Sequence, residues 1–332
     1  MIRAKISDVA KLANVAPSTV SNALNGTKFV SEEIKQKVRE ACLKLNYMPN
    51  MLASSMRTQR TNLIGLFLAS SRGGFADFYC SVIEGVTLRA AEKDYNIIIY
   101  YDIENRTKLK SLLLNGRGPI DGAIMLTPSR KDFRIEELTD SNIQMVLIGK
   151  PYDVSDEISF VDVKNDRVAY DAAVHLLKSG YRRILFFNSD EKLSITKDRL
   201  CGYHRALEEH GTAFDEKYVY NVKSDEQKAE KLLEELMKNG LDFDAVITES
   251  DFSAKGVYSA LAKAGRAVGK DVGVIALGGH TYADRLTPKL STFFVDYAKL
   301  GELAVDMLVD KLNKKTAENY FISAEICKSE SF

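Results

Sequence analysis

A chain of 332 residues, 45% of them hydrophobic, is too long for one small core and predicts two or three domains. No apolar run approaches membrane-spanning length, and four distant cysteines and four scattered histidines lack metal-ligand spacing. The net charge is zero, but residues 1–60 carry ten Lys and Arg against four Asp and Glu, so the rest carries a net −6. Unless this clustering is chance, it favours a phosphate-binding segment on an acidic body.

Residues 6–24 have the pattern of two short helices joined by a tight turn. Ser7 is placed to cap the first helix, residues 14–16 form the turn, and Pro17 occupies a first helical position. The apolar residues expected to point inward are Val9, Ala10, Leu12, Ala13, Val20, Ala23 and Leu24. The outer face of the second helix consists of small polar residues, namely Ser18, Thr19, Ser21 and Asn22. This is a helix-turn-helix pattern, and such a face suits a DNA major groove, where Asn can pair with adenine.

A third amphipathic helix follows, with Ser31 as its cap and an apolar stripe at Ile34, Val38, Ala41, Cys42 and Leu45. The whole stretch resembles the DNA-binding headpiece of the LacI/GalR family of bacterial transcription regulators. The matching residues are Asp8-Val9-Ala10, Ala13, Val15, Ser18-Thr19-Val20-Ser21, Leu24-Asn25, Val30-Ser31, Val38, Leu45-Asn46-Tyr47 and Pro49-Asn50. Ala16 departs from the family's usual capping serine, a loss of about 1 kcal/mol. A helical subdomain without a DNA role would not require so long a match.

The resemblance implies a helix-turn-helix DNA-binding domain at residues 1–49 and a hinge helix with linker at 50–60. Paired hinge helices of a dimer would lie in the minor groove, with Met56 as the apolar wedge between base pairs. The alternative for this segment is an ordinary flexible linker. The residues expected to contact DNA are Ser7, Pro17, Ser18, Thr19, Ser21, Asn22, Asn25, Lys28, Tyr47, Asn50, Ala53, Met56 and Arg57.

From Thr61 onward, strands alternate with helices, and the first strand is a continuous apolar run typical of a buried parallel strand. Strands are expected at 63–69, 96–101, 121–126, 145–148, 183–187, 218–221, 244–248, 272–277, 291–295 and near 320–327. Helices are expected at 77–94, 106–115, 134–141, 166–179, 197–210, 225–239, 252–265 and 297–313. Two such layers of similar size indicate a two-lobed binding fold with a cleft.

The predicted fold is therefore an all-α helix-turn-helix headpiece plus an α/β two-lobed periplasmic-binding-protein-like domain with two doubly wound parallel sheets. The resemblance implies that residues 61–332 bind an effector and dimerise. Lobe 1 would comprise about 61–162 and 292–323, and lobe 2 about 163–291 and 324–332. By the same analogy, residues 77–94 and 297–313 would contribute to the dimer interface.

Ligands in open α/β sheets bind outside the carboxyl ends of strands. The effector-binding residues expected there are Ser71, Arg72, Phe78, Tyr79, Ser129, Lys150, Arg199, Asp251 and His280. The resemblance implies an aromatic pocket at Phe78 and Tyr79 and a ligand contact at Arg199, although each residue singly could have a structural role in its loop. Gly278 and Gly279 stand where the family usually has an aspartate, and Lys150 lies where an acid is frequent. We therefore expect a less acidic pocket and an anionic effector held by Arg72, Lys150 or Arg199.

Together with these patterns, the resemblance implies a dimeric, cytoplasmic transcription regulator, a repressor of carbohydrate or related metabolic genes. Its expected partners are an inverted-repeat operator in double-stranded DNA, a sugar or sugar derivative, and a second copy of the chain, with no membrane. We expect no cofactor, metal or catalytic residue, because no HExxH, nucleophile elbow, P-loop or GxGxxG occurs. The alternatives are a solute-binding protein with a vestigial headpiece and an enzyme fused to a DNA anchor.

Overall fold

The computed structural model describes residues 4–25, 29–47, 60–69, 76–101, 106–114, 120–153, 158–279 and 281–332. These residues belong to two compact units, residues 1–61 and 62–332. Among them, no helix is both long enough and apolar enough to cross a membrane.

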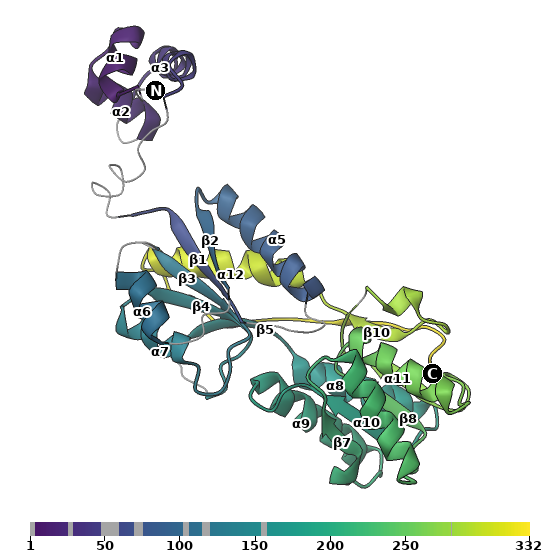
Figure 1. Cartoon of the computed structure of the whole chain (residues 1–332). Helices are drawn as coiled ribbons and strands as arrows, with labels where there is room; N and C mark the ends of the chain where they lie inside the picture. The colour runs from purple at the N-terminus through teal and green to yellow at the C-terminus, as the bar shows by residue number, and fades with distance from the viewer. Residues whose placement is uncertain are drawn as a thin grey trace. The chain divides into compact units, whose positions relative to one another are not determined.

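The described residues of the first unit form three helices: α1 (Ile6–Ala13), α2 (Pro17–Asn25) and α3 (Glu32–Lys44) (Figure 1). Its core consists of the buried residues Val9, Ala10, Ala13, Val20, Val38 and Ala41. The predicted cap of α3 is confirmed, because the Ser31 hydroxyl accepts the backbone N–H of Ile34 at 3.5 Å. The predicted first position of α2 is also confirmed, since the helix begins at Pro17.

Two expectations for α1 are wrong. The N-cap is Lys5 rather than Ser7, and the Lys5 N–H donates to the Asp8 carboxylate at 2.8 Å. Ser7 therefore lies inside the helix. Leu12 does not point inward but is 50% exposed, because it lies about 100° around the helix from the centre of the stripe formed by Val9, Ala10 and Ala13.

The second unit is built on two sheets, each with six strands among the described residues (Figure 1). The first sheet has the order β11-β5-β4-β3-β1-β2 and the second β12-β10-β9-β8-β6-β7. Every neighbouring pair is parallel except β10 and β12, which are antiparallel. We call the part around the first sheet lobe 1 and the part around the second sheet lobe 2. Two largely parallel sheets with helices on both faces confirm the predicted fold class.

The predicted elements are present with bounds that shift by a few residues. The strands are β1 (Leu63–Leu68), β2 (Asn96–Tyr101), β3 (Gly122–Leu126), β4 (Gln144–Ile148), β5 (Ser159–Val163), β6 (Ile184–Asn188), β7 (Val219–Asn221), β8 (Ala245–Thr248), β9 (Gly273–Ala276), β10 (Ser291–Phe294), β11 (Tyr320–Ile322) and β12 (Glu325–Cys327). The helices are α5 (Ala76–Glu92), α6 (Arg106–Leu114), α7 (Phe133–Asp140), α8 (Asn165–Lys178), α9 (Ser194–Glu209), α10 (Glu226–Lys238), α11 (Asp251–Lys263) and α12 (Tyr297–Leu312), with single turns at Glu216–Tyr218 and Ala283–Arg285.

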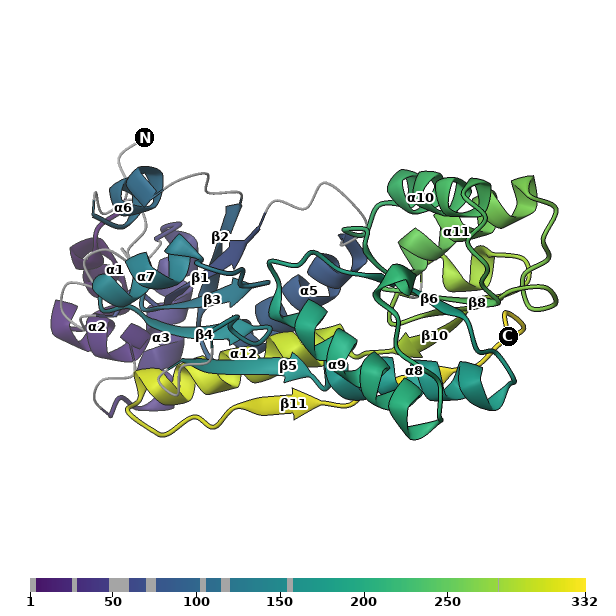
Figure 2. The same ribbon diagram turned by 90° about the horizontal axis from the view of Figure 1, so that it is seen from below.

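The way the chain passes between the lobes differs from the sequence-based expectation. Strand β10 pairs with β9, so it belongs to lobe 2, and the return to lobe 1 follows it rather than starting at residue 292. The single strand expected near 320–327 is two short strands, because β11 pairs with β5 and β12 pairs with β10 (Figure 2). Strand β5 was not among the predicted strands, since Asp162 interrupts its apolar pattern.

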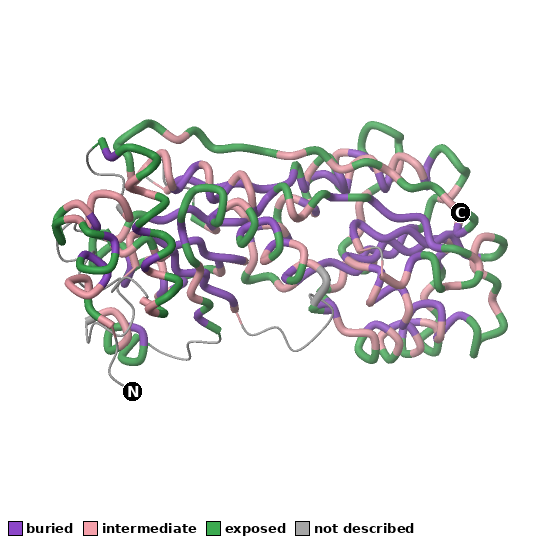
Figure 3. The backbone as a smooth tube through the Cα atoms, turned by 90° about the horizontal axis from the view of Figure 1, so that it is seen from above, coloured by how far each residue is buried: buried purple, intermediate pink, exposed green. Residues whose placement is uncertain are grey.

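Alternating side chains on each strand pack against different helices. In β1, Ile64, Leu66 and Leu68 belong to the same core cluster as Val82 and Val86 of α5. Phe67, which points the other way, packs in a second cluster with residues of α6 and α7. Buried backbone accordingly runs through the strands of both lobes (Figure 3). Both faces of the sheet are covered, as a parallel sheet requires.

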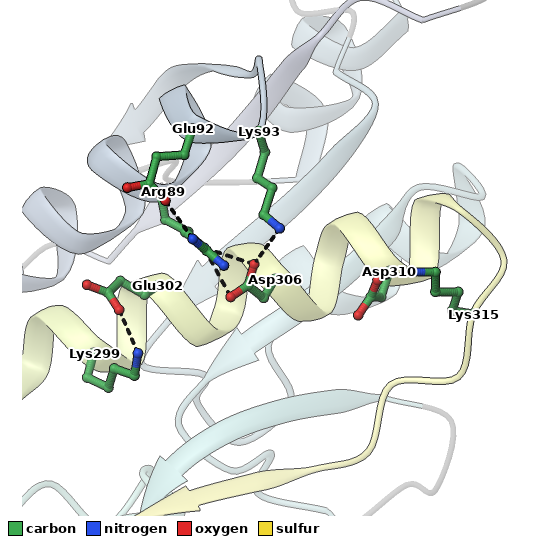
Figure 4. Close-up of polar contacts among 8 residues, drawn as sticks. All are labelled: Arg89, Glu92, Lys93, Lys299, Glu302, Asp306, Asp310 and Lys315. Carbon is green, nitrogen blue, oxygen red and sulfur yellow. Dashed lines mark hydrogen bonds and ion pairs between the residues drawn. The ribbon is translucent and has the colours of Figure 1, made fainter.

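Helices α5 and α12 cross closely in lobe 1, and two glycines permit the approach. A Cβ on Gly85 would lie 1.9 Å from the carbonyl oxygen of Ala298, and one on Gly301 would lie 2.5 Å from that of Val82. Farther along, Asp306 of α12 pairs with Arg89 of α5 (2.9 Å) and with Lys93, which directly follows that helix (3.2 Å) (Figure 4). Residues more than two hundred positions apart are thus held together by close backbone contact and by an ion-pair cluster.

We predict that Gly85→Ala lowers the free energy of unfolding by about 1–3 kcal/mol, because the added methyl meets backbone that cannot rotate away. Urea unfolding of the whole protein measures the change. Thr87→Ala is the matched control, since Thr87 is exposed on the same helix. Equal stability of the two variants would show that the crossing relaxes without cost.

Candidate functional site

A cavity of about 390 Å³ lies between the lobes, at the carboxyl ends of their strands. Its described walls come from residues in or directly after β3, β4, β5, β6, β8, β9 and β10, and from α5, α8, α9, α11 and α12. Polar side chains in these walls are Ser81, Glu84, Thr127, Asp162, Asn165, Ser189, Ser194, Arg199, Glu249, Ser250, Asp251, Thr281, Asp296 and Tyr297. The position agrees with the general rule for ligands in open α/β sheets.

Two aromatic rings form part of the apolar wall. Phe78 of α5 and Tyr297 of α12 meet edge to face, with ring centroids 5.0 Å apart and planes at 90°. Burial raises the pKa of the Tyr297 phenol to about 12, so its hydroxyl stays protonated and able to donate at neutral pH. The pair offers a ligand an apolar surface and a hydroxyl donor.

Arg199 is the only described cation in the cavity wall, and only 7% of it is exposed. Its guanidinium donates to the Ser189 hydroxyl at 3.0 Å and to the backbone oxygen of Glu249 at 3.4 Å. The Nε atom has no hydrogen-bond partner among the described residues. Burial lowers the pKa of Arg199, and the Glu249 charge opposes that shift. An arginine remains charged even so, and a buried guanidinium with unused donor capacity is suited to binding oxygen atoms of a ligand.

Glu249 and Asp251 bring two carboxylates to the end of β8. Glu249 accepts the hydroxyls of Ser250 at 2.8 Å and Ser253 at 2.6 Å, and burial raises its pKa. Asp251 begins α11 and accepts the backbone N–H of Tyr282 at 2.8 Å. Both carboxylates are therefore oriented by neighbouring donors and line the cavity.

Asp162, near the end of β5, is a third buried carboxylate in the wall. It accepts the backbone N–H groups of Lys150 at 2.8 Å and Val163 at 2.7 Å, and the Asn165 amide at 3.1 Å. Burial raises the pKa of Asp162 to about 6, although the two backbone donors oppose the shift.

The cavity contains three of the residues that the sequence predicts for effector binding: Phe78, Arg199 and Asp251. Tyr79 is buried beside the cavity, where its hydroxyl lies 3.3 Å from that of Thr127. Ser71, Arg72 and His280 lie outside the described residues.

Ser129 and Lys150 have other partners. The Ser129 N–H and hydroxyl donate to the Asp132 carboxylate. Lys150, which the sequence predicts for effector binding, pairs with Asp198 at 2.6 Å and is not among the described residues of the cavity wall. The pairing partner lies 48 positions away on the other lobe, which no sequence pattern reveals.

The described wall is acidic, with Glu84, Asp162, Glu249, Asp251 and Asp296 against one arginine. Sequence reasoning missed Asp162 and Glu249. Each is a single acidic residue within or directly after an apolar strand. Because burying an unpaired charge costs free energy, an acid in such a position is a sequence signal for a functional or paired carboxylate. An anionic ligand would meet more carboxylates than cations, which argues against the expected anionic effector.

In the first unit, α2 presents the predicted polar face. Pro17 and Ser18 are exposed, and Thr19, Ser21 and Asn22 are partly exposed. Residue 16 is an alanine, so α2 starts without a side-chain cap there, and the Ala16 carbonyl accepts the N–H groups of Thr19 and Val20.

The other residues predicted to contact DNA lie at the end of α2, in other segments of the first unit, or outside the described residues. Ser7 is partly buried in α1, and Tyr47 packs against the headpiece core. Asn25 ends α2. Lys28, Asn50, Ala53, Met56 and Arg57, and with them the predicted hinge helix, lie outside the described residues.

A helix-turn-helix unit joined to a two-lobed domain with a polar cavity defines a ligand-responsive DNA-binding regulator, and comparisons with known proteins agree. Residues 5–50 match the family model described as bacterial regulatory proteins, lacI family, and residues 173–332 match a periplasmic binding protein-like domain. The HTH-type transcriptional regulator MalR of Streptococcus pneumoniae is 31% identical over 316 residues, 93% of this chain and 92% of that protein. The chain therefore belongs to the LacI family of bacterial regulatory proteins and is a DNA-binding transcription regulator.

Solved structures have the same architecture. A complex of the transcriptional regulator CelR with cellobiose is 26% identical, with a TM-score of 0.76 over 99% of this chain and all of that one. The Lac repressor dimer bound to operator has the same fold, with a TM-score of 0.84, 21% identity and 99% of each chain covered. Within the described residues, no cluster of three or more His, Cys, Asp or Glu is arranged to hold a metal ion.

We predict that the Asp162 carboxyl titrates near pH 6 in a carbon-detected NMR titration. Its pKa is higher in the folded chain than in the unfolded one, so its contribution to stability is fullest below pH 3.8 and is lost as the pH rises through 6. Asp162→Asn should remove that part of the pH dependence of urea unfolding, whereas Asp140→Asn, at the exposed end of α7, should leave it. If the free energy of unfolding of Asp162→Asn depends on pH as that of the unmodified protein does, the raised pKa is contradicted.

Proposed function

We propose that the protein is a cytoplasmic, homodimeric repressor of carbohydrate or related metabolic genes, which binds an inverted-repeat operator and responds to a sugar in the interlobe cavity. The observation that carries this proposal is the buried Arg199, partly unpaired in a cavity that both lobes line, on a chain whose first unit is a helix-turn-helix. The cellobiose complex of CelR, 26% identical over nearly the whole chain, supports a sugar as the ligand.

The cavity favours an uncharged, hydroxyl-rich ligand. Carboxylates such as Glu249 and Asp251 can accept hydrogen bonds from sugar hydroxyls, and Arg199 can donate to ring or hydroxyl oxygens. The edge-to-face pair of Phe78 and Tyr297 gives an apolar surface for a sugar face. We propose that this ligand is bound and released without turnover. An enzyme fused to a DNA anchor would instead consume it.

On the DNA side, we propose that α2 lies in the major groove of each half-site with Asn22 reading a base. Residues 50–60 would form the hinge helix, with Met56 opening the minor groove at the operator centre. The basic residues of the first sixty positions would contact phosphates, so affinity should fall steeply with salt.

For dimerisation, we propose the outer face of lobe 1 along α5 and its neighbouring edge strand β2. Three large apolar side chains are exposed there: Leu88, Ile99 and Tyr101. Helix α12, also expected at the interface, packs against α5 and against β3, β4 and β5, so much of its surface is already covered within the protomer. Ligand binding would change the angle between the lobes and so the spacing of the headpieces. For the ligand to control DNA binding, it must bind the operator-competent and the operator-incompetent forms of the protein with different affinities.

Selection from a pool of random DNA duplexes tests this function directly. We expect enrichment of an inverted repeat, and we expect mass spectrometry of the purified protein to find a retained neutral sugar. Binding without any preference for a palindrome would favour a solute-binding protein with a vestigial headpiece.

We predict that Asn22→Ala relaxes base preference at one position of each half-site, at a cost of roughly 1–3 kcal/mol for the favoured base. Gel shifts with single-base operator variants measure it. Gln227→Ala, which removes an exposed amide from α10 in the second unit, should bind all variants as the unmodified protein does. If the Asn22 variant keeps its preference, another residue reads that base.

We also predict that Arg199→Met weakens sugar binding about 10- to 100-fold, because charge-assisted hydrogen bonds contribute roughly 1.5–3 kcal/mol. A thermal-shift screen with cellobiose and a panel of neutral and phosphorylated sugars provides the probe. Isothermal calorimetry then measures the best binder. Arg205→Met, on the same helix but partly exposed and close to Asp166, is the matched control. If only phosphorylated sugars stabilise the protein, the ligand is an anionic sugar and the proposal of a neutral one is wrong.

A further inference from the structure

The two lobes are joined beside the cavity by a group of contacts that shares only Ser194 with the described cavity wall. On lobe 1 the participants are Lys150 and Tyr152, in the loop after β4. On lobe 2 they are Ser194, Lys197 and Asp198, in the first turns of α9. We call these five residues the interlobe clasp.

Charge and aromatic contacts carry most of the clasp. The Lys150 ammonium lies 2.6 Å from the Asp198 carboxylate, and each of these side chains is 25% exposed, so solvent screens the pair only in part. The Lys197 ammonium lies 3.8 Å from the centroid of the Tyr152 ring. The Ser194 hydroxyl donates to the backbone oxygen of Lys150. One short helical segment thus holds a single loop of the other lobe through three kinds of interaction.

Backbone contacts also join the two lobes next to the interlobe clasp. The Arg130 N–H donates to the carbonyl of Lys192 at 2.8 Å, and Ser129 and Leu193 form an antiparallel bridge. The segment before α9 is therefore attached to the loop after β3, and the first turns of α9 are attached to the loop after β4. All of these contacts would have to break together for the lobes to separate here.

The clasp is continuous with the cavity. Ser194 belongs to both, and Asp198 directly precedes Arg199 in α9. Any movement of the first turns of α9 away from lobe 1 would break the Lys150–Asp198 pair and would also shift the Arg199 guanidinium. The position of Arg199 in the cavity and the closure of the lobes are thus mechanically coupled.

We propose that the interlobe clasp holds the lobes closed in the absence of ligand. The closed, ligand-competent form then exists before ligand arrives, and the ligand need not supply the free energy of closure. Weakening the clasp should populate an open form and should lower apparent ligand affinity by the fraction of closed protein that is lost.

The distance between lobes in the ligand-free, DNA-free full chain tests this proposal, so the result does not depend on the proposed function. Exposed Cys80 on α5 and Cys201 on α9 can carry spin labels, one on each lobe, in a Cys42→Ala and Cys327→Ser background. Labelled protein is diluted with unlabelled protein to suppress distances between protomers, and pulsed electron resonance gives the distance distribution.

We expect one short distance in the unmodified clasp. Asp198→Asn, Lys150→Met and Tyr152→Leu should each raise the ratio of long to short distances roughly two- to five-fold, the effect expected from losing one partly exposed contact. The swapped pair Lys150→Asp with Asp198→Lys should restore the short distance. Glu302→Gln, which removes an ion pair within lobe 1, is the control and should change nothing (Figure 4).

Three results would overturn the proposal: distributions unaltered in all of the single variants, an equal change in Glu302→Gln, or a swapped pair that stays as open as the single variants. Circular dichroism spectra that match the parent protein establish that each variant is folded.

Discussion

The buried guanidinium of Arg199 is the constraint around which the ligand domain is arranged. A cation removed from water needs compensation from fixed acceptors and nearby negative charge. Ser189 and the Glu249 backbone supply acceptors, and the Glu249 carboxylate supplies charge. Arg199 lines a cavity whose other charged side chains, among the described residues, are all carboxylates. A ligand with many hydroxyls satisfies both kinds of group, which is why the residues favour a sugar over an anion.

Lobe 1 shows how a ligand signal can reach the opposite end of the second unit. Helix α12 starts at the cavity with Tyr297 and packs along its length on α5, which itself starts beside the cavity near Phe78. The glycine crossing and the Arg89–Asp306 pair make these two helices one rigid layer. Tight packing of this kind transmits a change of position rather than absorbing it. A ligand that moves either helix start therefore displaces the whole layer.

Much of this architecture follows from the amino-acid pattern. Alternating strands and helices, the cap at Ser31 and proline at the start of α2 were all predictable, because each depends on neighbours within a few positions. The crossings of the chain between lobes were less predictable, since a three-residue strand such as β12 has little periodicity. The candidate site shows the same division. Arg199 and Phe78 were found through the family resemblance, whereas the pairing of Lys150 with Asp198 and the burial of Glu249 depend on contacts between distant segments.

The order of the elements along the chain has a consequence for how the protein is made. Lobe 1 contains β1 near its start but cannot be completed without α12 and β11, which the ribosome delivers after the whole of lobe 2 up to β10. Until then α12 is missing from the face of the first sheet and from the face of α5 that it covers in the complete protein. Nascent chains therefore expose these apolar faces for most of translation. A product that ends before residue 297 would carry the helix-turn-helix on a second unit whose lobe 1 is incomplete.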